Sequence, residues 1–256
     1  MNTQNAVPTT DRAKEANNQL VFSYLALRNF IGYCGLLLPI LLLLFTNTKG
    51  DDLKLENAIS DYFYTSAGEI FVVLMSVLGV FLITYKGYEW KENALTSIAG
   101  IAALGVVFSP TTTKYARETF TVHSAQNSVA HLGSFEVHLM FAGLFFICLG
   151  IMSLVYFPKS DAFSLRDERG HRTQKAKRNI IYRICGWTIL SSIAVLIIYF
   201  LCQPLKDRLG SFPFTFILET TAVVAFGISW LTKGETFWPD GEHYMVRYYK
   251  QLREKI

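Results

Sequence analysis

The amino-acid sequence predicts an all-α, polytopic membrane protein with six transmembrane helices and with both termini in the cytoplasm. Hydrophobic residues make up 51% of the 256 residues and charged residues 17%, and the apolar residues occur in blocks. A bilayer core of about 30 Å requires roughly 20 mostly apolar residues per helix, and six blocks approach that length. Lysine and arginine also gather in alternate connecting segments, as they do around membrane spans.

The predicted spans follow the six apolar blocks in order. Their bounds are Asn29–Phe45, Gly68–Tyr85, Ala94–Phe108, Phe135–Phe157, Ile180–Cys202 and Phe212–Leu231. The third is short and rich in glycine and alanine, and we retain it because small residues let packed helices approach closely. The chain therefore divides into an amino tail (1–28), a six-helix domain (29–232) and a carboxyl tail (233–256), with both tails cytoplasmic.

The orientation of the spans follows from the positions of lysine and arginine, which favour the cytoplasmic side. Eighteen of these residues fall in the two tails and the two inner connections, and six fall in the three outer connections. Omitting the third span would move the most basic connection, Pro158–Arg183, to the outside. Because Met1–Arg28 is polar and lacks the apolar core of a signal peptide, we expect the first span to be an uncleaved anchor.

This topology limits location and partners. We expect an integral protein of the plasma membrane or of a bacterial inner membrane. The topology and anionic lipid headgroups account for the basic residues, so the expected partners are membrane lipids and not nucleic acid; the oligomeric state is not predicted. All four cysteines fall within or at the ends of spans without a CxxC pair, and we expect them to be buried thiols: Cys34, Cys148, Cys185 and Cys202.

Acidic residues gather near one face of the predicted bundle, at the outer ends of the spans. Asp61 and Tyr64 precede the second span, and Glu69 lies just inside it. Glu219 follows the start of the sixth span by about 10 Å, at 1.5 Å per residue. Charged groups at membrane depth are costly and usually face the bundle interior or a watery cavity.

Histidines before the fourth span extend this polar layer. In a helix, a polar stripe with steps of four, four, three and four would run through His123, Asn127, His131, Ser134 and His138. Gly133 is a point at which such a helix can break. His138 itself begins the fourth span at the outer side.

Three interpretations of the polar layer are open. It can be a hydrogen-bond network that fastens the helix ends, a small cavity that binds or modifies a lipid headgroup, or part of a proton or ion path. The path is least favoured because no charged residue continues through the inner halves of the spans. The predicted ligand-binding residues are Asp61, Tyr64, Glu69, His123, His131, His138 and Glu219.

Several short motifs occur in order along residues 29–232. They are ISD at residues 59–61, Glu69 with Phe71, a third span rich in alanine and glycine, Val137–His138 followed by Ala142 and Phe145–Phe146, and Glu219 followed by FGISW. In these features the chain resembles FRAG/DRAM-type six-helix membrane proteins. The resemblance implies a six-helix fold and a role in lipid handling. The chain departs from that pattern at Asn57–Ala58 and Ala67–Gly68, where those proteins usually have proline, and at Thr220, where they often have tryptophan.

A second resemblance concerns catalysis. Alkaline ceramidase and adiponectin-receptor-type membrane hydrolases hold zinc with serine, aspartate and three histidines in a seven-helix bundle. This chain offers these residue types on one side, but with six predicted spans and no HxxxH in the last: Ser60, Asp61, His123, His131 and His138. Catalytic zinc needs three protein ligands and an open position, and the resemblance implies Asp61, His131 and His138.

The chain carries no motif that is typical of other enzyme classes, since it lacks a P-loop, GxSxG and HExxH. We therefore predict non-catalytic lipid binding or membrane maintenance through an outer-leaflet cavity, without a metal cofactor. The alternative is a zinc-dependent membrane hydrolase that acts on a lipid amide or ester.

Overall fold

The chain is helical almost throughout the part that the structure describes. The computed structural model describes residues 19–46, 55–87, 89–110, 131–132, 135–159, 173–210, 212–237 and 246. Its long helices are α2 (Gln19–Thr46), α3 (Gly68–Thr84), α4 (Trp90–Phe108), α6 (Val137–Ile151), α7 (Gln174–Leu201) and α9 (Phe214–Lys233). The short elements are the 3₁₀ helix η2 (Ile59–Tyr64), the strands β1 (His131–Leu132) and β2 (Phe135–Glu136), the π-helical turn η3 (Met152–Tyr156) and α8 (Gln203–Leu209).

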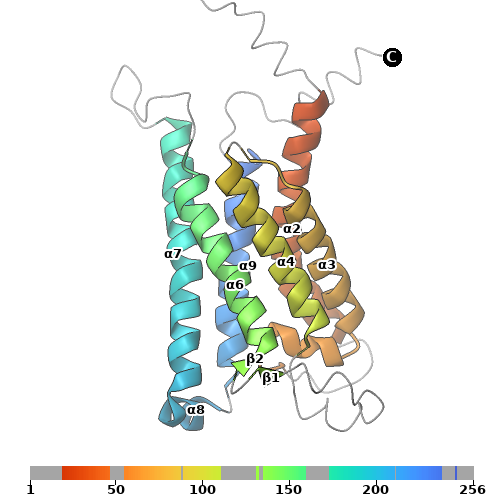
Figure 1. The fold of residues 1–256 in the computed structure, drawn as a ribbon, viewed down its shortest axis with the longest axis vertical. Helices are drawn as coiled ribbons and strands as arrows, with labels where there is room; N and C mark the ends of the chain where they lie inside the picture. The colour runs from red at the N-terminus through yellow and green to blue at the C-terminus, as the bar shows by residue number, and fades with distance from the viewer. Residues whose placement is uncertain are drawn as a thin grey trace, which may run out of the picture.

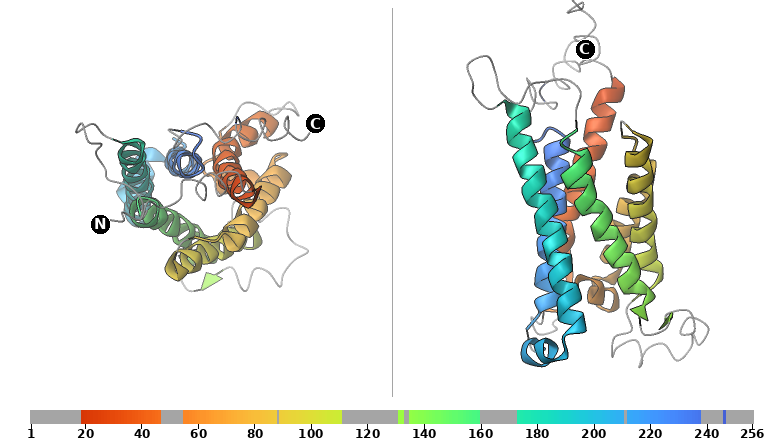
Figure 2. Two further views of the ribbon diagram at one scale, coloured as in Figure 1. Left: turned by 90° about the horizontal axis from the view of Figure 1, so that it is seen from above. Right: turned by 60° about the vertical axis from the view of Figure 1, so that its left-hand side comes forward.

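The six long helices form a closed ring. Each helix packs on the next along the chain, and α9 returns to pack on α2; the view from above in Figure 2 shows this arrangement. The helices run alternately in opposite directions, so α2 begins and α9 finishes at the same end of the bundle (Figure 1). We call this end the Arg28 end, and the opposite end, which carries η2 and α8, the η2 end.

The prediction of an apolar helical bundle is confirmed. Five helical segments are long and apolar enough to cross a membrane: Tyr24–Thr46, Trp90–Phe108, Val137–Tyr156, Gln174–Leu201 and Phe214–Lys233. The third predicted span, the shortest in the sequence, is thus a 19-residue helix. By contrast, α3 is apolar but has 17 residues, which is about 26 Å at 1.5 Å per residue.

Three helices, α2, α4 and α7, begin earlier than hydropathy alone predicts. α2 begins at Gln19, within the predicted amino tail, and α7 begins at Gln174, six residues before Ile180. At α7 the reason is local, because the Thr173 hydroxyl accepts a hydrogen bond from the Ala176 N–H and so caps a polar first turn. Helical structure therefore extends beyond the apolar blocks at the Arg28 end.

The predicted start of the fourth span is wrong by two residues, and the predicted helical stripe is interrupted. Phe135–Glu136 is a strand that pairs antiparallel with His131–Leu132, and α6 begins only at Val137. Glycine and serine separate the two strands in sequence, and both disfavour helix interiors. His131 and His138 therefore do not follow one another on one helix face.

Neighbouring helices approach closely at paired glycines. A Cβ atom at Gly227 of α9 would lie 2.8 Å from the carbonyl oxygen of Gly32 in α2. Likewise, a Cβ at Gly100 of α4 would collide with the carbonyl oxygen of Gly79 in α3. Backbones that touch in this way gain van der Waals contact, which drives helix association in lipid.

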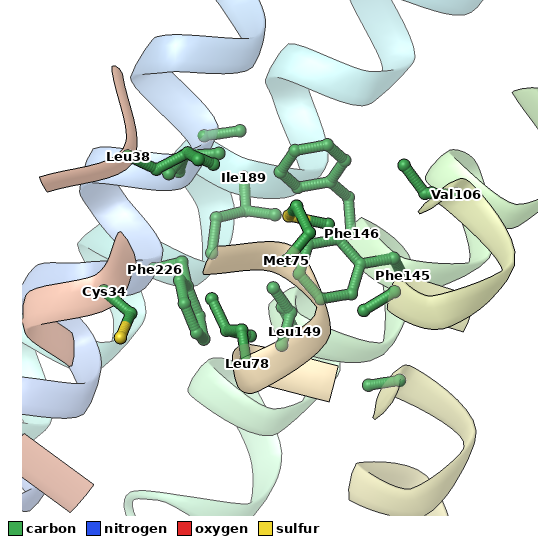
Figure 3. Close-up of a cluster of buried hydrophobic side chains, with 14 of the residues drawn as sticks. Cys34, Leu38, Met75, Leu78, Val106, Phe145, Phe146, Leu149, Ile189 and Phe226 are labelled. Atoms are coloured by element: carbon green, nitrogen blue, oxygen red, sulfur yellow. The ribbon is translucent and has the colours of Figure 1, made fainter. Parts of the chain in front are cut away.

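The middle of the ring is filled with apolar side chains. Figure 3 shows side chains from all six long helices meeting there, and the set includes Cys34, Leu38, Met75, Val106, Phe145, Ile189 and Phe226. Farther toward the Arg28 end, the Ser153 hydroxyl of η3 donates to the Ser229 hydroxyl of α9 at 2.9 Å, and both residues are buried. The apolar layer separates polar groups at the two ends of the ring.

Candidate functional site

A small cavity lies inside the ring at the η2 end. Its volume is about 40 Å³, which is room for roughly three water molecules. Three polar side chains line it, namely Ser60 from η2, His138 from α6 and Glu219 from α9. The rest of the wall is apolar and includes several of the side chains in Figure 3: Leu38, Met75, Val106, Phe145 and Phe146.

Glu219 is held in place by the backbone of η2. Its Oε2 accepts a hydrogen bond of 2.7 Å from the N–H of Ile59, the first residue of η2. One turn earlier in α9, the Phe216 N–H donates to the carbonyl oxygen of Asn57 at 2.7 Å. Because the first N–H groups of a helix lack partners within it, these two bonds satisfy the starts of both helices and fix Glu219 at the cavity.

His138 is positioned by the end of α4. The residue is buried in the first turn of α6, and its Nδ1 lies 2.8 Å from the carbonyl oxygen of Ser109, directly after α4. A carbonyl oxygen only accepts hydrogen bonds, so Nδ1 donates, and Nε2 is the acceptor of the neutral ring.

Ser60 supplies a hydroxyl group to the same cavity. The residue is only 7% exposed and lines the cavity. A hydroxyl group can both donate and accept a hydrogen bond, so this group is suited to bind a molecule inside the cavity. From the sequence, Ser60 was considered only among the residue types of a possible zinc site, and it was not one of the predicted ligand-binding residues.

The structure brings together two of the predicted site residues, His138 and Glu219. Asp61 and Tyr64 lie beside them on η2, half-buried, but among the described residues they do not line the cavity. Asp61 is close enough to Glu219 for the two carboxyl groups to interact electrostatically. Glu69 is exposed in the first turn of α3.

The remaining two predicted residues are not described at the level of side chains. His123 lies outside the described residues, and only the backbone of His131 is described, in β1. Among the described residues, no three His, Cys, Asp or Glu side chains form a group that could hold a metal. The predicted zinc alternative needs His131 and therefore stays a prediction. The four cysteines are free thiols, three buried and Cys202 half-buried.

A second polar cluster, which the sequence pattern did not reveal, lies at the Arg28 end. The Arg28 guanidinium donates to the Tyr85 hydroxyl at 3.2 Å, and this hydroxyl donates to Glu92 Oε1 at 3.1 Å. All three residues are buried. The Arg28 guanidinium also lies 4.1 Å from the centre of the Tyr24 ring, a cation–π contact. The cluster joins α2, the end of α3 and the first turn of α4.

Lys233 joins α9 to the end of η3 in the same region. Its buried ammonium donates to the carbonyl oxygen of Phe157 at 3.2 Å and lies 5.5 Å from the Phe157 ring centre. The last carbonyls of a helix lack partners and attract cations. The sequence did contain a signal for this cluster, because Arg28, Glu92 and Lys233 stand at the borders of predicted spans. Arg28 and Lys233 were counted there only as basic residues of the two tails.

Comparisons with protein-family models, with curated proteins and with solved structures find no match to this chain. The likeness to FRAG/DRAM-type proteins therefore stays a prediction.

Proposed function

We propose that this protein crosses the membrane six times, with the Arg28 end in the cytoplasm, and binds the polar end of a lipid in the cavity at the η2 end. With α3 included, six antiparallel helices carry the chain across six times. The 17 residues of α3 are at the short end of the range for a membrane helix. The distribution of lysine and arginine supports the orientation, and in this orientation the cavity lies in the outer leaflet.

The orientation has a direct test with a thiol reagent that does not cross membranes. Single cysteines are introduced by Thr173→Cys, at the Arg28 end, and by Asp207→Cys, exposed on α8. The background carries Cys202→Ser, because Cys202 is the least buried native thiol. Intact cells should label the Asp207 variant, whereas the Thr173 variant should label only after permeabilisation. The reverse pattern would invert the proposed topology.

The observation that carries the lipid-binding proposal is the hydroxyl group of Ser60 in the wall of the cavity, in a residue that is only 7% exposed. Glu219 and His138 flank the same space. Ligand cavities are mostly apolar with a few convergent polar groups, and this cavity has that composition. Its small volume fits the tip of a headgroup rather than a whole one, while the apolar wall suits the adjoining carbons.

Filling the cavity should remove the bound lipid. Ala142 of α6 lines the cavity, whereas the next residue, Gly143, has open space where its Cβ would be. We expect Ala142→Phe to lower the amount of co-purifying lipid about tenfold, the equivalent of ~1.4 kcal/mol, and Gly143→Phe to leave it unchanged. Quantitative mass spectrometry of lipids extracted from the purified variants gives the measurement. Equal retention in both variants would show that lipid does not occupy the cavity.

A metal-dependent hydrolase is the second candidate, and one observation favours it. Metal-ligating histidines often donate one ring N–H to a backbone carbonyl, and His138 donates from Nδ1 to the carbonyl oxygen of Ser109. Metal analysis of the same purified samples distinguishes lipid binding from metal-dependent hydrolysis. Stoichiometric zinc without added metal, lost on His138→Ala, would replace lipid binding by metal-dependent hydrolysis as the proposed function.

A further inference from the structure

The exposed part of the cavity wall lies on one side of the ring. Among the described residues that line the cavity, Ala142 of α6 and Glu219 of α9 are half-buried, and the others are buried. α6 and α9 are the two long helices on which α7 packs, yet no residue of α7 is among the described residues of the wall. The cavity therefore has its mouth between α6 and α9, on the side where α7 lies.

This mouth is uncovered because α7 diverges from α6 toward the η2 end (Figures 1 and 2). Nearer the Arg28 end the two helices touch, since a Cβ atom at Gly150 of α6 would lie 2.5 Å from Cδ2 of Leu190 in α7. Leu139 and Ile197 stand on the same helix faces as these two residues, about three and two turns nearer the η2 end. They are 36% and 51% exposed, so an apolar gap replaces the contact there.

The gap has about the depth of one leaflet of a bilayer. Gly150, where the helices touch, lies 13 residues after Val137, the first residue of α6, which is about 20 Å at 1.5 Å per residue. Half of a hydrocarbon core of about 30 Å is roughly 15 Å, the depth that the chains of one leaflet occupy. A membrane helix of a partner protein would cross the whole core and meet the closed part of the seam. The gap therefore fits a lipid chain better than a helix.

We propose that the bound lipid reaches the cavity sideways from the outer leaflet, an inference that rests on the proposed lipid binding. Its polar tip enters between Ala142 and Glu219. One of its acyl chains lies in the gap between Leu139 and Ile197. A chain in the gap remains in apolar surroundings, as it is in the bilayer, so the gap decides where the chain lies more than how much lipid is bound.

Photocrosslinking locates the chain directly. The purified full-length protein in detergent is loaded with equal amounts of phosphatidylethanolamine and phosphatidylglycerol that carry a diazirine midway along one acyl chain. After removal of unbound lipid and illumination, the crosslinked residues are identified by mass spectrometry and counted per retained lipid. We expect at least tenfold more crosslinks on α6 and α7 than on α2 and α3, which form the seam on the opposite side of the ring.

Two neighbouring residues of α7 provide a matched pair of variants. Ile197 faces the gap, whereas Ile198 is turned by about 100° round the helix and is 59% exposed. Ile197→Trp fills part of the gap and should lower the crosslinks on α6 severalfold, while Ile198→Trp should leave them unchanged. Because both residues are exposed, neither substitution disturbs the interior of the ring.

The outcomes separate this inference from the proposed function. Lipid that is retained and is lost in Ala142→Phe, but that crosslinks mainly to α2 and α3, would overturn entry beside α7 and leave lipid binding standing. Equal crosslinks on α6 in the Ile197 and Ile198 variants would also overturn it. Failure of the wild-type protein to retain any lipid would overturn both. The map of the wild-type protein tests the inference even if a variant does not fold.

Discussion

Replacing Glu92 by alanine is expected to destabilise the bundle by about 3–5 kcal/mol, the usual cost of removing one partner from a buried charged network. Glu92 is 2% exposed and accepts the Tyr85 hydroxyl, which in turn accepts from Arg28. Without the carboxylate, the buried Arg28 guanidinium loses the negative charge that Tyr85 links to it. The first turn of α4 also loses an acidic residue that favours its N-terminal end.

The measurement is thermal unfolding of the purified variants in one detergent. Glu89→Ala is the matched control, because Glu89 also stands at the start of α4 but pairs with Lys159 on the surface, at 3.3 Å with both side chains about half exposed. Exposed pairs contribute about 0–1 kcal/mol, so the control should unfold near the wild-type temperature. Similar losses in the two variants would mean that the Arg28 end is accessible to water.

Replacing Glu219 by lysine is expected to cost a few kcal/mol, as a poorly placed charge inside a membrane bundle does. Lysine has no acceptor, so the Ile59 N–H loses its bond, and a long cation enters a cavity with apolar walls. Glu219→Gln should be mild, within about 1 kcal/mol, because an amide oxygen can accept the same bond. The lysine variant is therefore expected to aggregate or to unfold at a much lower temperature.

Glu69→Lys provides the control for this charge reversal. Glu69 is exposed in the first turn of α3, where an acidic residue contributes about 0.3–1 kcal/mol. Size-exclusion profiles and unfolding temperatures should therefore place Glu69→Lys close to the wild type and far from Glu219→Lys. If glutamine and lysine are tolerated equally at position 219, the side chain reaches bulk water and does not face an enclosed cavity.

The sequence was sufficient to locate the helices because their signal is local. A block of apolar residues predicts a membrane helix from its own length, which is why even the weak third span is confirmed as α4. The early start of α7 depends instead on a single capping bond from Thr173, which hydropathy does not register. The strand pair before α6 depends on pairing between short segments, whereas helical spacing alone suggested a continuous stripe.

The candidate site could be predicted only in part, for a physical reason. Glu219 and His138 were recognisable because a charged or titratable group among apolar residues is costly anywhere in a span. Their partners were not, since Glu219 binds the backbone of Ile59, 160 residues away. No periodicity encodes such a contact. The Tyr85 bridge between Arg28 and Glu92 was invisible for the same reason, because it appears only when three helices meet.

The apolar layer in the middle of the ring opposes the passage of ions through the protein (Figure 3). An ion that entered it would give up its hydration for side chains such as Leu38, Phe145 and Ile189, at an idealised cost of order 20 kcal/mol. With the helices across a membrane as proposed, the electrical potential of that membrane would fall over this layer. A change at the η2 end would then reach the Arg28 end through movement of the helices, because the described side chains of this layer are apolar.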